Sequence, residues 1–346
     1  GSILQTISSG NDIFSPIFQK YPLTQYIWES PLKIFLLKIL STNSILAIGL
    51  VFITINILPT LGIFFNRKTR FYKLTSLLIL FTPIFKICFQ NIGLGDGFTI
   101  LMSILLVLLN DTFSYFILIL LLGLWHPGQA TFIVISALIS KFLKEKSFYN
   151  NQVSKSIFKG KRNYVLSSII SLIISRFILN IYNMNLGFNY LNRFDYLINK
   201  APDFIIYNII HSPISLIVPF LFIILVVSKL NKINYLTKNI VIIWILTCSI
   251  TSILTTDVTR VVNIILIPLY LSILESIGIY EFISKIKIFE FNKKNIFIFS
   301  IIIFIAFLPN YGWDGINFTM WDNFFDDICK YGFYCLNKSD VSKILT

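Results

Sequence analysis

The chain is poor in charged residues, and it has few acidic residues, histidines and cysteines. Only 13% of its 346 residues are charged, with 16 acidic against 29 basic side chains, and it contains 2 His and 4 Cys. An ordinary soluble domain carries about 25% charged residues. No His/Cys cluster has the spacing of a zinc site, and no Gly-x-Ser-x-Gly motif is present. These absences disfavour a soluble enzyme, a zinc protein and a serine hydrolase, and they leave the identity of any metal ligand unknown.

Apolar residues are abundant and are grouped in long runs. The hydrophobic fraction is 55%, the mean hydropathy is +0.78, and runs approaching 20 residues recur along the chain. This pattern predicts an all-α polytopic membrane protein with about nine transmembrane or membrane-embedded helices plus external amphipathic segments. We expect one integral membrane domain over 1–346, made of an external N-terminal loop (1–40), membrane helices (43–311) and an external C-terminal tail (312–346).

Three compact apolar segments lie in the middle of the chain, at 97–110, 113–125 and 129–143. At 1.5 Å per residue the first two reach only about 20 Å, short of a hydrocarbon core of about 30 Å. They are either a re-entrant pair or two short crossings. A basic loop, Lys141–Arg162, and a span over 163–183 are expected to follow.

The distribution of basic residues predicts the orientation. Four loops on one side of the predicted membrane hold 18 of the 29 Lys and Arg residues, and 11 of the 16 acidic residues lie on the other side. The positive-inside rule makes the basic side cytoplasmic and places both ends of the given chain outside. The net charge of +13 therefore follows from topology, and we predict no nucleic-acid partner. The basic loops are 65–73, 141–162, 229–238 and 281–294.

A glycine-rich stretch, Asn91–Thr99, places Asp96 on the predicted outer face, flanked by Gly95 and Gly97. The stretch lacks the Gly-Lys-Ser/Thr of a P-loop and does not follow a strand as a dinucleotide fingerprint does. Glycine permits sharp turns and close backbone approach to a ligand. The stretch is therefore either a simple interhelical turn or a site in which Asp96 acts as a general base or contacts a metal.

Several cations lie near the outer ends of predicted spans. Lys86 and Arg176 fall in the outer halves of their spans, where a charge costs a few kcal/mol unless it faces a cavity or a partner. One interpretation is that they extend to the membrane surface or pair with a carboxylate such as Asp96. The other is that they form a cationic pocket for phosphate. Asp257 and Arg260 share a helix face, so they either form a helix-end salt bridge or make Arg260 a phosphate clamp that Asp257 orients.

Other external groups complete the list of candidates. His126 and Gln129 join two short segments and either cap them at the interface or bond substrate hydroxyls. Cys329 and Cys335 close a short external loop, and we expect a structural disulfide between them in an oxidising compartment. The remaining candidates on the same face are Arg193 and Asp195 as substrate-orienting groups, and Asp12, which in isolation is an ordinary helix cap.

This layout resembles the GT-C class of membrane glycosyltransferases, which use polyprenyl-phosphate sugars on the non-cytoplasmic side. In that class a catalytic Asp follows the first helix, and short helices pack close to the active site. Asp12 occupies the matching position if one helix precedes residue 1, and segments 97–125 resemble the short pair. The class often uses a divalent cation such as Mg²⁺ or Mn²⁺, although the residues themselves demand none.

The resemblance implies that Asp12, together with Asp96, deprotonates an acceptor, while Arg260 with Lys86 or Arg176 neutralises the departing lipid phosphate. The expected partners are the lipid bilayer, a polyprenyl-phosphate-linked sugar, and a glycan or lipid acceptor.

We therefore expect a glycosyltransferase of cell-surface glycan assembly, in a bacterial inner membrane with its active face periplasmic or extracellular. Three alternatives stay open: a transporter or flippase of a lipid-linked or anionic solute, a polysaccharide polymerase or ligase, and a non-catalytic assembly subunit.

Overall fold

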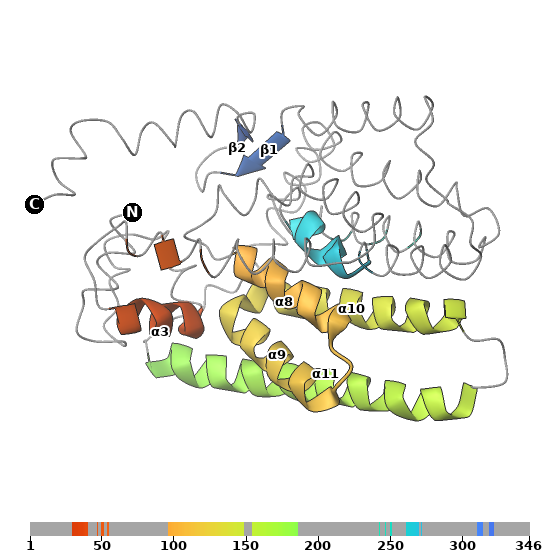
Figure 1. Ribbon diagram of the computed structural model, residues 1–346. Helices are drawn as coiled ribbons and strands as arrows, with labels where there is room; N and C mark the ends of the chain where they lie inside the picture. Colours follow the sequence, from red (N-terminus) through yellow and green to blue (C-terminus); the bar gives the residue numbers. More distant parts are fainter. Residues whose placement is uncertain are drawn as a thin grey trace, which may run out of the picture.

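The structure is a computed structural model, and Figure 1 shows its helices packed in a bundle. It describes residues 30–40, 96–148, 154–185, 261–269 and 271, two strands at 310–313 and 318–321, and the single helical positions Ala47, Leu50, Val51, Thr54, Ile242, Leu246 and Ile250. The labelled elements are α3 (Pro31–Leu40), α8 (Asp96–Leu108), α9 (Thr112–Trp125), α10 (Pro127–Phe148), α11 (Ser154–Asn185), β1 (Asn310–Trp313) and β2 (Phe318–Trp321).

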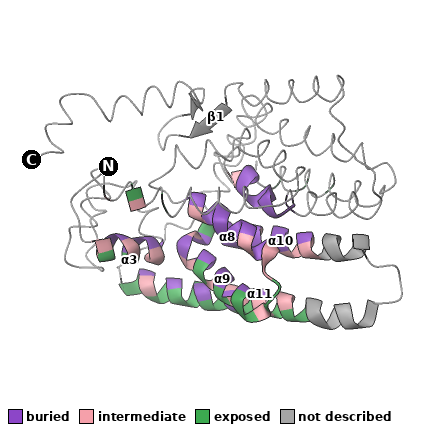
Figure 2. Ribbon diagram, in the orientation of Figure 1, coloured by how far each residue is buried: buried purple, intermediate pink, exposed green. Residues whose placement is uncertain are grey.

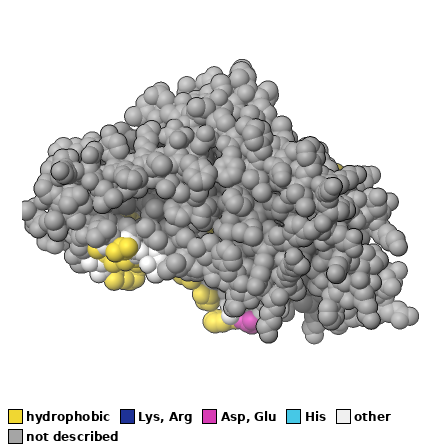
Figure 3. Space-filling model, turned by 45° about the horizontal axis from the view of Figure 1, so that its top comes forward, with side chains coloured by type: hydrophobic (Ala, Val, Ile, Leu, Met, Phe, Trp, Pro, Cys, Tyr) yellow, Lys and Arg dark blue, Asp and Glu magenta, His cyan; other side chains and the backbone are white. Residues whose placement is uncertain are grey.

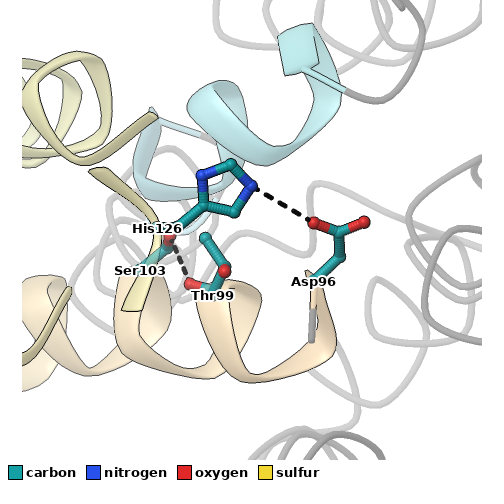
Figure 4. A network of polar contacts seen from close by, with 4 residues as sticks. All are labelled: Asp96, Thr99, Ser103 and His126. Carbon is teal, nitrogen blue, oxygen red and sulfur yellow. Dashed lines mark hydrogen bonds and ion pairs between the residues drawn. The ribbon is translucent and has the colours of Figure 1, made fainter. Parts of the chain in front are cut away.

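Helix α9 is at the centre of the described bundle. It packs against α8, α10 and α11, and α3 packs across it as well. In Figure 1, α8 and α9 form a short hairpin, while α10 and α11 continue past the tip of that hairpin. Both Figure 1 and Figure 4 also draw the helical segment 261–269 next to the N-terminal end of α8.

The limits of α9 and α10 follow from local sequence. Asp111 has extended backbone (φ −87°, ψ 130°), and its side chain accepts a hydrogen bond from the Ser114 backbone N–H at 2.7 Å, which caps the start of α9. Pro127 disfavours helical backbone at the residue before it, so α9 ends at Trp125. Proline is also well suited to the first position of a helix, where α10 begins.

The predicted all-α class is confirmed for the packed part of the described chain, in which every element is a helix. The short segments predicted at 97–110, 113–125 and 129–143 correspond to α8, α9 and α10. The predicted number of spans and their topology stay predictions. One described segment, Arg162–Asn185, is long and apolar enough to cross a membrane by length and composition alone.

Three details differ from the sequence prediction. The expected basic loop over 141–162 is mostly helical, because α10 continues to Phe148 and α11 begins at Ser154. The segment has no proline and is rich in lysine, which favours helix. The predicted loop 1–40 contains α3. The start of the predicted tail 312–346 forms an antiparallel hairpin of β1 and β2, with Asn310 opposite Trp321.

The polarity of α11 is reversed relative to a helix of a water-soluble protein. Its buried residues include Ser168, Ser171, Ser175 and Asn183, while most of its exposed residues, green in Figure 2, are large and apolar. A soluble amphipathic helix turns its apolar stripe inward. The described side chains that are visible in Figure 3 are hydrophobic for the most part, with an acidic side chain among them. The exposed apolar residues of α11 are Leu166, Ile169, Ile170, Ile173, Ile174, Phe177, Ile178, Ile181 and Met184.

Small residues let α9 and α11 approach closely. Gly123 of α9 lies against Ser175 of α11, and a Cβ at position 123 would lie 2.6 Å from the Ser175 Cβ. The Ser171 hydroxyl donates to the Phe116 carbonyl at 2.6 Å. Close backbone approach through glycine and serine, with hydroxyl-to-carbonyl hydrogen bonds between helices, is the packing mode of helices in bilayers.

The tip of the α8–α9 hairpin is fastened to the two longer helices. The Lys141 ammonium of α10 donates to the Leu109 carbonyl, and the Tyr164 hydroxyl of α11 donates to the Asn110 carbonyl. The same ammonium lies 4.7 Å from the centre of the Tyr164 ring and 5.3 Å from that of Tyr115. Hydrogen bonds and cation–π contacts therefore hold the turn in place.

We predict that Gly123→Ala lowers the free energy of unfolding by about 1–3 kcal/mol, the usual cost of overpacking, because the new methyl group meets the Ser175 side chain. Thermal unfolding of the purified chain in detergent measures it. Ser175→Gly in the same chain should restore much of the loss. If the double variant is as unstable as Gly123→Ala alone, this contact is not what limits the approach of the helices.

The cap of α9 should make stability depend on acid pH. Hydrogen bonds from Ser114 hold the pKa of Asp111 below its ordinary value of 3.8, so the cap stabilises the fold above that value and is lost as pH falls through the lower folded pKa. We expect the unfolding temperature of the original chain to fall more between about pH 5 and pH 2 than that of Asp111→Asn, whose amide caps without titrating. Identical pH dependence would contradict the role of this cap.

Candidate functional site

The elbow between α9 and α10 fixes the backbone of His126. Its N–H donates to the Leu122 carbonyl at 2.8 Å, which closes α9. Its own carbonyl accepts from the N–H groups of Gln129 at 3.2 Å and Ala130 at 3.1 Å, which opens α10. Both helix ends therefore determine where the imidazole lies.

Asp96 is the first residue of α8, where a carboxylate interacts favourably with the helix dipole. Its side chain is completely buried and points toward the imidazole, with Oδ1 3.6 Å from His126 Nε2 (Figure 4). The His126 side chain is 19% exposed. The distance is that of an ion pair and is longer than a direct hydrogen bond. Solvent therefore reaches the pair through the imidazole, because the carboxylate is inaccessible.

Aromatic and cationic side chains surround this pair. Phe98 of α8 meets Trp125 of α9 edge-on, with ring centres 4.7 Å apart, and the buried Lys33 ammonium of α3 lies 5.5 Å from the centre of the Trp125 ring. On the other side, the exposed Arg176 of α11 donates from Nη2 to the Pro127 carbonyl at 2.9 Å. One carboxylate, one imidazole and two cations thus gather at the helix ends.

The contact between Arg176 and Pro127 fixes where the elbow lies along α11. Arg176 is nine residues before the C-terminal end of that helix, so the helix continues about 14 Å beyond the elbow. The exposed residues of this continuation include Phe177, Ile181 and Met184. The elbow therefore lies beside α11, short of the C-terminal end of that helix.

The structure brings four of the predicted site residues together. Asp96 and His126 contact each other, Arg176 binds the next residue of the elbow, and Gln129 lies in the first turn of α10 with its side chain buried. Their proposed roles stay predictions. The other predicted residues lie outside the described part of the chain: Asp12, Lys86, Arg193, Asp195, Asp257, Arg260, Cys329 and Cys335.

The sequence analysis did not identify Lys33 or Trp125 as neighbours of the site. The signal for Lys33 was present in Ser30-Pro31, because serine before proline is a typical start of a helix. A helix from Pro31 places Lys33 beside Ile34 and Leu37 on the buried face. No local pattern indicates that this face packs on α9, since that contact joins segments about 90 residues apart in sequence.

A divalent cation needs several oxygen or nitrogen ligands. Within the described residues, no group of three His, Cys, Asp or Glu side chains lies close enough to hold a metal ion. Asp96 and His126 therefore supply two such groups in this part of the chain, and we derive no chemical step through a metal.

Comparisons with protein-family models, with curated proteins and with solved structures find no match to this chain. The functional argument therefore depends on the geometry of the Asp96–His126 pair and its surroundings.

We predict an energetic coupling between Asp96 and His126. A carboxylate buried beside an imidazole loses its partner when either is replaced, so Asp96→Asn and His126→Gln should be non-additive in unfolding free energy by about 0.5–3 kcal/mol. Thermal unfolding of the two single variants and the double variant measures the coupling. Ser168→Ala, on α11, combined with Asp96→Asn provides the control and should be additive. Additive effects of the Asp96 and His126 changes would show that the pair does not interact.

Proposed function

We propose that this chain is a membrane glycosyltransferase, which moves a sugar from a polyprenyl-phosphate donor to an acceptor on the non-cytoplasmic face. The observation that carries the proposal is the Asp96–His126 pair, with a buried carboxylate and a partly exposed imidazole, and with Arg176 bound one residue away. The choice of a sugar as the transferred group comes from the resemblance to GT-C enzymes.

A bilayer setting is supported by the reversed polarity of α11. Most of its large apolar side chains are exposed, whereas Ser168, Ser171, Ser175 and Asn183 are buried. In water this arrangement exposes an apolar stripe along a helix that is 32 residues long, whereas in lipid the same stripe faces hydrocarbon. The close contact of Gly123 with Ser175 supports the same setting.

The chemistry of the pair fits general-base catalysis. His126 is partly exposed and can take a proton from an acceptor hydroxyl, and Asp96 behind it stabilises the imidazolium that forms. The C–O bond to the phosphate then breaks as the acceptor oxygen bonds to the anomeric carbon. The phosphate departs as an anion, and a guanidinium is well suited to receive it. In this mechanism Arg176 binds the departing phosphate, with Arg260 and Lys86 as the further cations predicted from sequence.

Variants of these residues test the proposal in vesicles that contain a polyprenyl-phosphate sugar and an acceptor. His126→Gln and Asp96→Asn should each lower the transfer rate by about 10²–10⁴-fold, the usual contribution of a general base. Arg176→Gln should lower it by about 10²–10³-fold through lost charge stabilisation. Arg162→Gln, an exposed cation at the opposite end of the same apolar segment, is the matched control and should keep the rate.

Two further variants test the residues that the resemblance adds. Asp12→Asn and Arg260→Ala should lose transfer while inserting normally into the membrane. Full transfer by both variants would contradict the assignment to GT-C enzymes, and full transfer by His126→Gln would contradict a base at the elbow.

A second candidate is a transporter or flippase, which the buried polar groups of α10 favour. Gln129, Ser136 and Ser140 continue the polar character of the site along the helix. The same vesicles distinguish the two functions. Movement of labelled lipid-linked sugar to the opposite leaflet, without any transfer to acceptor, would support this second candidate.

A further inference from the structure

Helix α10 carries three buried polar groups that have no hydrogen-bond partner. The side chains of Gln129, Ser136 and Ser140 are 4%, 4% and 0% exposed, and Gln129 Oε1 and both serine hydroxyls make no hydrogen bond. Spacings of seven and four residues place the three on one face of the helix. Buried polar groups in proteins are nearly always satisfied, and water is the usual partner when no protein group is.

Other serines of the chain show that back-bonding to the helix is available. The Ser103, Ser168 and Ser175 hydroxyls each donate to a carbonyl of the preceding turn, at 2.8–2.9 Å. Ser136 and Ser140 do not, although they are equally helical and equally buried. The helix backbone therefore does not satisfy these two hydroxyls.

Helix α8, which packs against α10, also carries buried polar side chains. On α8, Asp96, Thr99 and Ser103 are completely buried, and Figure 4 shows Thr99 and Ser103 below His126. The two helices start together, where Asp96 meets His126, and they meet again where the Leu109 carbonyl accepts from Lys141. Helices α8 and α10 therefore run side by side in the same direction for about four turns.

The polar groups are spaced at similar intervals along the helix axes. At 1.5 Å per residue, Thr99 and Gln129 lie about 4.5 Å along the helices from the Asp96–His126 level, and Ser103 lies at about 10.5 Å. Ser136 follows at about 15 Å and Ser140 at about 21 Å. The steps along the helix axis are about 4.5–6 Å, close to the length of two hydrogen bonds of about 2.8 Å, which is the distance that one water molecule bridges.

We propose that α8 and α10 hold a file of bound water molecules, which runs from the Asp96–His126 pair to Ser140. The waters satisfy Gln129, Ser136 and Ser140, and they bring hydrogen bonds to the buried side of the pair without opening it to bulk solvent. The file also connects His126 to the level of Lys141, where α8 ends. The proposal does not depend on which reaction the pair performs.

X-ray radiolytic labelling of the full chain in lipid nanodiscs tests the proposal, because hydroxyl radicals form at bound waters and oxidise adjacent sulfur. Ser136→Cys and Ser140→Cys should be oxidised about tenfold faster than Ala130→Cys and Ala137→Cys, which are equally buried neighbours on the same helix. Mass spectrometry measures the rates. Equal rates at all four positions would overturn the proposal.

A measurement on the unsubstituted protein keeps the test independent of whether the variants fold. Water-edited solid-state NMR should show faster magnetisation transfer from water to Gln129, Ser136 and Ser140 than to Ala137. Transfer as slow as at Ala137 would show a dry interface and would overturn the proposal. Neither experiment measures sugar transfer, so the failure of this inference and the failure of the proposed function are distinguishable.

Discussion

The close contact of α9 with α11 is the constraint on which the described bundle depends. Because Gly123 has no side chain, Ser175 can lie directly against the α9 backbone, and the two helix axes come together along most of α9. That approach brings Arg176 within hydrogen-bond distance of the Pro127 carbonyl. The elbow that carries His126 is thereby tied to a helix that continues well past it, which sets the depth of the site.

The opposite end of the α8–α9 hairpin is equally constrained. Lys141 and Tyr164 bind its turn, and Asp111 caps the start of α9 inside that turn. A hairpin held at its tip and at its open end has little freedom to slide. Asp96 and His126 lie at its open end. Because both ends of the hairpin are held, the distance between this carboxylate and this imidazole is fixed. Preorganisation of this kind is what general-base chemistry requires.

Local signals predicted the helices well and the contacts between them poorly. Hydropathy runs located α8, α9 and α10, and the Trp125-His126-Pro127 stretch marked the elbow because proline interrupts helix. The positive charge of segment 141–162 predicts a cytoplasmic loop, whereas its lysine content and its lack of proline favour the helix that the structure shows over most of it. The sequence analysis predicted that Asp96 and His126 share a face, but their separation depends on packing between distant segments, which no local pattern encodes.

The contact between Gly123 and Ser175 also has a consequence for comparing sequences. The side chains at positions 123 and 175 occupy the same space between the helices. In related chains, a larger side chain at one position should therefore occur with a smaller one at the other. A larger residue at 123 would accompany glycine at 175. Such correlated substitution would be a signature of this helix contact in related chains.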